Sequence, residues 1–271
     1  MAIETVVGDP LSNAVKSRLG KNELALSMIV RLVRGVEIAS LAKTAGVDSI
    51  YVDLEHCAFS LDTTSQICMA CLAVGVAPFV RVPGVDPNLI ARILDGGALG
   101  IIVPHVESRE DAAAVVQAAK YPAQGKRSFS SALPHFRFGA VAAPDAMRAI
   151  NAETMVVAMI ESARGVERAD EIAGVAGIDI LHVGANDLSN DLGVPGQLDH
   201  AVVKDAYRTV WDACRRHGKH LGVGGLASKP DFADELVRMG ARYLTTGSDL
   251  GFMLGAATDR VGRLRLAHPA R

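Results

Sequence analysis

Short apolar runs alternate with amphipathic stretches along nearly the whole chain. The runs are rich in Val, Ile, Leu and Ala and show little polar alternation, which is typical of strands buried on both faces of a parallel sheet. We predict eight such strands, at Ala25–Val30, Ser49–Leu54, Ala77–Val82, Gly100–Pro104, Met155–Ile160, Asp179–Val183, His220–Val223 and Tyr243–Thr246.

The stretches between these runs have the periodicity of helices. Examples are Leu61–Val74, Asn88–Asp95, Arg109–Lys120, Arg164–Ala173, Ala201–His217 and Pro230–Met239. Glycines of the kind that end helices precede several strands, at Gly46, Gly75, Gly97, Gly177, Gly218 and Gly240. Strict alternation favours parallel pairing through right-handed crossovers, and closing eight strands gives a (β/α)8 TIM barrel of the α/β class.

An open, doubly wound sheet is the alternative fold. It predicts about five or six strands and usually a glycine-rich turn after the first strand. The first turn here, Arg31–Val36, has no G-x-G-x-x-G pattern. We therefore expect residues 1–271 to form a single (β/α)8 barrel domain, which commonly occupies a chain of this length.

One segment, at about 122–152, interrupts the alternation. It is rich in Ala, Ser, Pro and basic residues, including Lys126, Arg127 and Arg137. A long loop inside a compact domain often forms a lid or an interface. We predict a long loop or interface insertion here, and a solvated surface loop is the simpler alternative.

Composition narrows the possible partners. Hydrophobic residues make up 49% of the 271 residues and the formal net charge is −2, with dispersed charges, so no nucleic-acid or membrane partner is expected. No apolar run reaches the ~18 residues of a membrane span, and the N-terminus lacks the layout of a signal peptide, so we expect a cytoplasmic protein. Cys68 and Cys71 have a metal-like spacing but lie in an apolar helical run, which indicates buried thiols.

Charged residues gather where the predicted strands end. Asp53-Leu-Glu55-His56 closes the second strand, Arg81 lies at the end of the third, and Glu161 follows the fifth. In a (β/α)8 barrel the carboxyl ends of the strands meet at one face, where the reactive groups lie. We therefore expect these side chains to converge.

Two carboxylates stand on neighbouring strands, because Asp187 follows the sixth strand as Glu161 follows the fifth. Paired carboxylates, completed by water and substrate oxygens, suit Mg²⁺ or Mn²⁺. The simpler interpretations are an ion pair of Glu161 with Arg164 and a helix cap at Asp187. The occurrence of both acids at strand ends favours the metal.

The remaining candidates suit acid–base chemistry. Arg81 stands at the end of an apolar strand, where its buried charge requires an anion beside it. A bound oxo acid, or a buried partner such as Asp53 or Glu55, would supply that anion. His56 follows two acids and could transfer protons near neutral pH. No lysine stands at a strand end, and we place Lys120 in a helix or surface turn, which argues against imine-forming chemistry. We interpret His182 as a packing residue.

Several segments carry a family resemblance when taken in order. They are Ala45-Gly-Val-Asp-Ser-Ile-Tyr-Val-Asp-Leu-Glu-His56, Val80-Arg-Val-Pro83, Leu94-Asp-Gly-Gly-Ala98, Tyr121-Pro-x-x-Gly-x-Arg127, Ile160-Glu161 and Val183-Gly-Ala-Asn-Asp-Leu-Ser189. With this spacing the chain resembles the HpcH/HpaI aldolase family, metal-dependent pyruvate aldolases, from about Glu37 to Leu254. The resemblance implies a phosphoenolpyruvate/pyruvate-type barrel that cleaves a 4-hydroxy-2-oxo acid to pyruvate, or a related 2-oxo acid, and an aldehyde.

The resemblance also implies roles at the metal. Glu161 and Asp187 would hold a divalent cation such as Mg²⁺, Mn²⁺ or Co²⁺, which the 2-oxo group and carboxylate of the substrate chelate. Arg81 would polarise the oxo group. Backbone N–H groups of Asn186 and Asp187 would receive the substrate carboxylate, as a helix N-terminus readily does.

A second group of roles concerns the acceptor side. The resemblance implies that His56, supported by Asp53 and Glu55, is the base that acts on the 4-hydroxyl. Asp95 would reach this histidine from a neighbouring subunit, because family members are typically hexamers built as trimers of dimers. The chain departs from many members at Met159, where they carry Gln.

Three alternatives stay open. A citrate-lyase-like enzyme uses a similar carboxylate pair, although such relatives tend to carry Asp-Leu-Glu-Asp where this chain has Asp53-Leu-Glu-His56. An oxaloacetate decarboxylase would use the same enolate chemistry. A non-catalytic barrel that serves as an oligomeric binding protein is the alternative outside enzymes.

Overall fold

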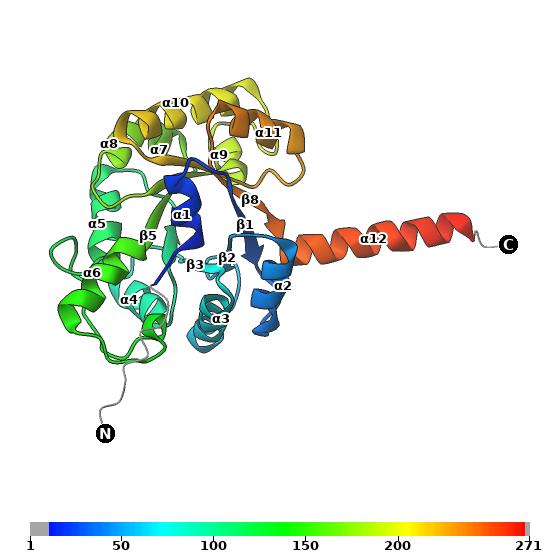
Figure 1. Cartoon of the computed structure of the whole chain (residues 1–271). Helices are drawn as coiled ribbons and strands as arrows, with labels where there is room; N and C mark the ends of the chain where they lie inside the picture. Colours follow the sequence, from blue (N-terminus) through cyan, green and yellow to red (C-terminus); the bar gives the residue numbers. More distant parts are fainter. Residues whose placement is uncertain (1–10, 269–271) are drawn as a thin grey trace.

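A computed structural model describes residues 11–268 and confirms the (β/α)8 barrel (Figure 1). The eight strands are parallel, pair in sequence order and close between β1 and β8. They are β1 (Ala25–Val30), β2 (Ser49–Asp53), β3 (Ala77–Arg81), β4 (Gly100–Val103), β5 (Met155–Ile160), β6 (Ile180–Gly184), β7 (His220–Gly224) and β8 (Tyr243–Ser248). The sequence had predicted every one, with boundaries within about two residues.

Helices follow the strands around the outside of the barrel. They are α1 (Ala14–Gly20), α2 (Glu37–Ala45), α3 (Leu61–Val74), α4 (Pro87–Asp95), α5 (Arg109–Ala119), α6 (Ala143–Glu153), α7 (Ala163–Glu167), α8 (Ala169–Ala173), α9 (Ala185–Asp191), α10 (Ala201–His217), α11 (Pro230–Met239) and α12 (Asp249–Ala267). The predicted helix Arg164–Ala173 is divided into α7 and α8 at Arg168.

Local sequence signals explain where these helices begin and end. Asp86 caps α4, since its carboxylate accepts the backbone N–H groups of Asn88 and Leu89, and Pro87 occupies the first turn, where its missing N–H costs nothing. Gly75 ends α3 in the left-handed conformation, at φ 71°, which L side chains rarely adopt.

Apolar side chains fill two layers. One lies inside the barrel and includes Tyr51, Phe79, Met159 and Tyr243. The larger layer lies between the strands and the surrounding helices. Six of the strands, β2 to β7, are buried almost throughout, which explains why their sequences are apolar without alternation.

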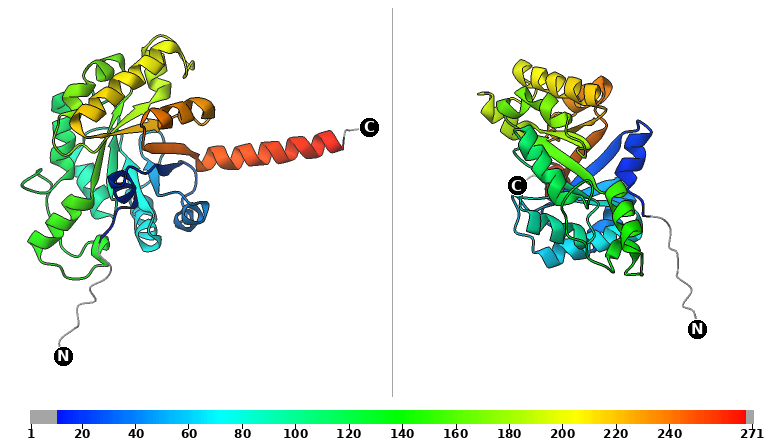
Figure 2. Two further views of the ribbon diagram at one scale, coloured as in Figure 1. Left: turned by 45° about the horizontal axis from the view of Figure 1, so that its top comes forward. Right: turned by 90° about the vertical axis from the view of Figure 1, so that its left-hand side faces the viewer.

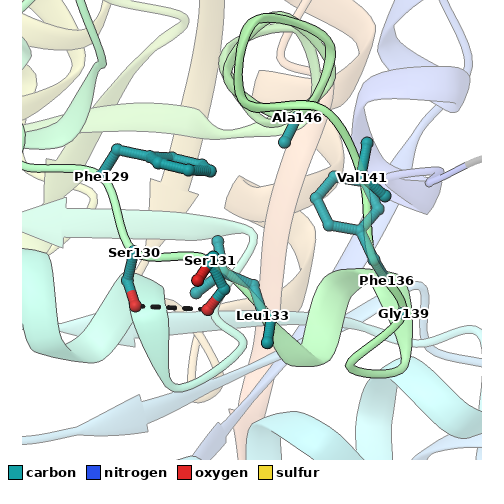
Figure 3. A pocket seen from close by; sticks show the side chains of 9 residues that line it. Phe129, Ser130, Ser131, Leu133, Phe136, Gly139, Val141 and Ala146 are labelled. Atoms are coloured by element: carbon teal, nitrogen blue, oxygen red, sulfur yellow. Dashed lines mark hydrogen bonds between the residues drawn. The ribbon is translucent and has the colours of Figure 1, made fainter.

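The segment predicted as a long loop at about 122–152 is half helical. It contains a short 3-10 helix, η1 (Pro134–Phe136), and most of α6. Pro144 and its neighbours resembled loop sequence, but proline in the first turn of a helix is favourable. The part before α6 folds against α6 and forms a small hollow lined by Phe129, Leu133, Phe136 and Val141 (Figure 3).

The last helix does not cover the barrel. In Figures 1 and 2, α12 leaves the end of β8 and projects into solvent. Asp249 is its one buried residue. Seven large apolar side chains on it are exposed: Leu250, Phe252, Met253, Leu254, Val261, Leu264 and Leu266. Within residues 11–268, no helix combines the length and apolar character needed to cross a membrane.

Candidate active site

A fork-shaped ion pair stands at the carboxyl ends of β2 and β3. Asp53 and Arg81 are register partners, so their side chains lie side by side. Arg81 donates from Nε to Oδ1 of Asp53 at 3.0 Å and from Nη2 to Oδ2 at 2.7 Å. Both residues are buried. The buried partner anticipated for Arg81 is therefore present, and the bidentate contact fixes the plane of its guanidinium.

Asp53 organises the start of the following loop as well. Its carboxylate accepts the backbone N–H groups of Glu55 and His56, each at 3.2 Å, and Nε of Arg31 at 3.1 Å. Burial alone would raise the pKa of the Asp53 carboxyl. The hydrogen bonds and positive charge of Arg81, aided by Arg31, outweigh burial and hold that pKa below its usual value.

Glu55 and His56 complete this half of the barrel mouth. Nη1 of Arg81 lies 3.0 Å from Oε2 of Glu55, and Nε2 of His56 lies 3.7 Å from the same oxygen. The His56 ring is about half exposed. Asp53, Glu55, His56 and Arg81 therefore form one cluster, as the sequence predicted; we call it the arginine cluster.

Glu161 stands across the mouth, directly after β5, and is buried. Its Oε1 accepts the backbone N–H of His105 at 2.9 Å and lies 3.3 Å from Nδ1 of the same residue. The alternative ion pair with Arg164 is not formed, since Arg164 contacts Glu107 instead. Burial, and then the charges of Glu55 and Asp187, raise the pKa of the Glu161 carboxyl, although the His105 N–H opposes them.

Asp187 lies in the first turn of α9, near enough for its charge to act on Glu161. It is exposed and is not the helix cap, because the cap position belongs to Gly184, which offers no side chain. The first-turn N–H groups, including those of Asn186 and Asp187, therefore have no side-chain capping partner. We call Glu161 and Asp187 the carboxylate pair.

The surroundings of Glu161 fit a divalent cation. Glu161 is a buried acid whose only recorded ion-pair partner, within the described residues, is a histidine. A Cβ atom at Gly184 would lie 2.6 Å from Oε2 of Glu161, so glycine keeps room beside that oxygen. Ligand atoms of Glu55, His105 and Glu161 also lie within 4.8 Å of one another. Oxygen-rich donors of this kind suit Mg²⁺ and Mn²⁺.

His105 is a site residue that the sequence placed after the fourth strand but left without a role. It follows β4 in the pair Pro104-His105, and its ring lies between Glu161 and Glu55, with Nε2 3.8 Å from Oε1 of Glu55. Its position after a strand was the available signal. The left-handed backbone that turns it toward Glu161, at φ 52°, was not readable from the sequence.

Asp95 does not join the site within one chain. Its carboxylate accepts Nη2 of Arg127 at 2.6 Å, and the guanidinium of Arg127 lies over the Tyr121 ring, 4.4 Å from its centre. The side chain of Arg127 is fully buried. Of the three cations considered for segment 122–152, Arg127 is therefore engaged in packing that segment against α4.

Two other residues interpreted from the sequence, Lys120 and His182, are both buried in the structure. Lys120 is buried rather than at the surface, and burial lowers the pKa of its ammonium to about 8. It donates to the carbonyls of Asn151 and Thr154, before β5, at the opposite end of the strands from Glu161. His182 is a packing residue as predicted: it lies inside the barrel against Tyr243, and burial lowers its pKa to about 3.

Comparison with known proteins identifies the family. The model of the HpcH/HpaI aldolase/citrate lyase family matches residues 34–256. The chain belongs to this family. It is 35% identical over 253 residues to the 4-hydroxy-4-methyl-2-oxoglutarate aldolase of Hapsidospora irregularis, covering 92% of this chain and 94% of that protein. It is 32% identical over 248 residues to the 5-keto-4-deoxy-D-glucarate aldolase of Escherichia coli, covering 92% and 95%.

Two solved structures have the same fold. The HpcH/HpaI aldolase of Desulfitobacterium hafniense superposes with a TM-score of 0.86 at 31% identity, over 92% of this chain and 96% of that one. The citrate synthase SbnG superposes with a TM-score of 0.84 at 29% identity, over 96% and 100%. The barrel is thus a carbon–carbon lyase scaffold, and the relatives closest in sequence among these are aldolases.

Proposed function

We propose that the protein is a divalent-metal-dependent aldolase that reversibly cleaves a 4-hydroxy-2-oxo acid to pyruvate, or a related 2-oxo acid, and an aldehyde or ketone. The observation that carries this proposal is the closeness of Glu161 to the arginine cluster at one barrel mouth, where ligand atoms of Glu55, His105 and Glu161 lie within 4.8 Å of one another. A cation on one side and a fixed guanidinium on the other are what the developing enolate charge requires.

Glu161 and Asp187 would hold the cation. When bound, Mg²⁺, Mn²⁺ or Co²⁺ supplies a Lewis acid for the 2-oxo oxygen. The exposure of Asp187 and the space beside Gly184 leave that side of Glu161 open. The N–H groups of Asn186 and Asp187, at the start of α9, would receive the substrate carboxylate.

Arg81 would orient the substrate's oxo oxygen. Its guanidinium is held by Asp53 and Glu55 before any substrate arrives, so little reorganisation is needed as charge develops. Each of its nitrogens already has a carboxylate neighbour, and the substrate would share these N–H donors rather than replace Asp53.

His56 would take the proton from the substrate's 4-hydroxyl oxygen. Its backbone N–H is anchored on Asp53, its ring lies beside Glu55, and the open side of the ring can reach a bound molecule. A neighbouring carboxylate keeps such an imidazole oriented and stabilises its protonated form.

The substrate should carry a second carboxylate. The names of the two aldolases compared above, 4-hydroxy-4-methyl-2-oxoglutarate and 5-keto-4-deoxy-D-glucarate aldolase, both describe dicarboxylates. Arg31 follows β1, and its side chain is about one-third exposed beside Asp53. It is the cation at the mouth that we assign to the distal carboxylate.

We expect the protein to form a homo-oligomer. Leu26 on β1 and Leu244 on β8 are partly exposed, and the exposed apolar side chains of α12 need cover. A second chain would supply each surface to the other, and Asp95 would act across such an interface. Light scattering should show an oligomer that Leu254→Glu with Leu264→Glu dissociates, whereas Arg260→Glu on the same helix should not.

Pyruvate release from a panel of 4-hydroxy-2-oxo acids tests the proposal. The panel includes both dicarboxylates and is run after chelation and after return of Mg²⁺, Mn²⁺ or Co²⁺, with oxaloacetate and citrate as separate substrates. Release that depends on metal supports the proposal. Turnover that survives thorough chelation contradicts it, and activity confined to oxaloacetate or citrate points to the decarboxylase or citrate-lyase alternatives.

A further inference from the structure

His105 has an unusual backbone. Its φ of 52° places it in the left-handed region, which is uncommon for residues other than glycine, although histidine, asparagine and aspartate adopt it more often than most. Among the described residues with this conformation, it is the one that borders the carboxylate pair. The next residue, Val106, returns to β5 by donating its N–H to the carbonyl of Met159 at 3.2 Å, so the turn is held on both sides.

This turn directs two groups of His105 at one oxygen atom. The backbone N–H donates to Oε1 of Glu161 at 2.9 Å, and the ring Nδ1 lies 3.3 Å from the same atom. Because φ is the rotation about the N–Cα bond, its value sets where the imidazole lies relative to the N–H of the same residue. The conformation is therefore the means by which β4 reaches the acid of β5.

The second oxygen of Glu161 faces the other way. Oε2 borders the Cα of Gly184, at the end of β6, on the side where α9 and Asp187 begin. The two oxygens of this carboxylate therefore have different surroundings: Oε1 contacts His105, and Oε2 lies on the side of Asp187.

The far end of the His105 ring approaches the arginine cluster. Nε2 lies 3.8 Å from Oε1 of Glu55, whose Oε2 contacts Arg81. The ring is well exposed, whereas Glu161 beneath it is almost completely buried. His105 therefore spans the two halves of the mouth and covers the Oε1 side of Glu161.

We propose that His105 is a positioning residue that fixes the Glu161 carboxylate, so that Oε2 rather than Oε1 is presented together with Asp187 to the divalent cation. This inference rests on the proposed metal site. It assigns no bond from the imidazole to the metal: the ring acts through Glu161, in the way that outer partners orient metal ligands.

Two substitutions separate the ring from the backbone. His105→Gly keeps the left-handed conformation and removes the ring. His105→Asn also tolerates this conformation, and its side-chain amide nitrogen can replace Nδ1 beside Glu161. Alanine would combine ring loss with backbone strain, so it is a poor choice.

The test is Mn²⁺ affinity of the chelated full-length protein, followed through the electron paramagnetic resonance signal of free Mn²⁺, which needs no turnover. Loss of an outer partner typically weakens metal binding roughly 10- to 100-fold, and we expect this for His105→Gly. His105→Asn should stay within about threefold of the wild type, because it restores the contact to Oε1. Thermal unfolding should show that both variants fold.

Each other outcome overturns the inference in a recognisable way. Wild-type affinity in His105→Gly would mean that the ring does not position Glu161, and an Asn variant as weak as the Gly variant would exclude the Nδ1 contact. A nitrogen coupling to bound Mn²⁺ that disappears in His105→Gly would make His105 a direct ligand. Absence of Mn²⁺ binding in the wild type itself would remove the proposed function along with the inference.

Discussion

The two halves of the barrel mouth differ in how their charges are balanced. In the arginine cluster, Asp53 and Arg81 are joined by two short hydrogen bonds, and Arg31 and Glu55 complete the set. In the carboxylate pair, buried Glu161 and nearby Asp187 repel each other, and Glu161 has a raised pKa. In the first half the acids are paired with arginines of the same chain, whereas we propose that a divalent cation completes the second half.

The largest effect on activity should come from the carboxylate pair. Glu161→Gln and Asp187→Asn each remove a proposed metal ligand with almost no change of shape, so metal-dependent pyruvate release should fall by roughly a thousandfold or more, about 4 kcal/mol of barrier. Steady-state rates at saturating Mn²⁺ measure this. Glu107→Gln is the matched control, since the side chain of Glu107 contacts Ser162 and Arg164 near the mouth. Equal losses in all three variants would contradict the assignment.

Substitutions in the arginine cluster should act mainly on stability. Arg81→Met leaves the Asp53 carboxylate buried without its main partner and should lower the free energy of unfolding by roughly 3–5 kcal/mol. Adding Asp53→Asn to the same chain should restore part of that loss, because the unpaired charge is then absent. Urea unfolding of the single and double variants gives both numbers. A loss below about 1 kcal/mol in the single variant would show that the pair is not the buried unit described here.

The two carboxyls should give opposite dependences of stability on pH. Burial raises the folded-state pKa of Glu161, so its ionised form destabilises the metal-free protein above that pKa, and this penalty disappears as the pH falls through it. Asp53 has a lowered pKa, so its contribution is present at neutral pH and is lost only in acid, below the usual pKa of about 4.

Acidification of the chelated protein from pH 8 toward the usual glutamate pKa of about 4.5 should therefore favour the wild type over Glu161→Gln, which cannot take up this proton. Unfolding temperatures of both proteins across this range measure the difference, and added Mn²⁺ should reduce it by stabilising the wild type at pH 8. An unchanged difference between wild type and Glu161→Gln from pH 8 to pH 4.5 would contradict the assigned direction.

The smallest effect should come from a residue at the edge of the arginine cluster. Asp249, at the start of α12, accepts the backbone N–H groups of Arg31, Leu32 and Val33. Asp249→Asn weakens these charge-assisted bonds, and we expect a loss of roughly 1–2 kcal/mol with a rise in KM for a dicarboxylate but little change in kcat. Asp259→Asn, on the exposed part of the same helix, is the control. A change in kcat alone would place Asp249 outside this role.

Most of the fold was readable from the sequence. The strands are short apolar runs buried on both faces, and glycines such as Gly75 end the helices between them, so both patterns have direct physical causes. The same rules place Asp53, Arg81 and Glu161 at one mouth, because the carboxyl ends of parallel strands coincide.

The features that sequence reasoning missed depend on tertiary structure. The position of His105 after a strand was visible, but its left-handed backbone could not be read from Pro104-His105. Lys120 is buried because carbonyls before β5 meet its ammonium, although its helical context resembled a surface position. The projection of α12 away from the barrel is likewise a matter of tertiary arrangement, which local pattern does not encode.

Mn²⁺ binding to the chelated protein tests most directly whether the carboxylate pair is incomplete without a cation. The account predicts a single saturable site per chain in the wild type and in Glu107→Gln, and loss of that site in both Glu161→Gln and Asp187→Asn. Tight binding that survives both substitutions, or no binding in the wild type, would contradict it.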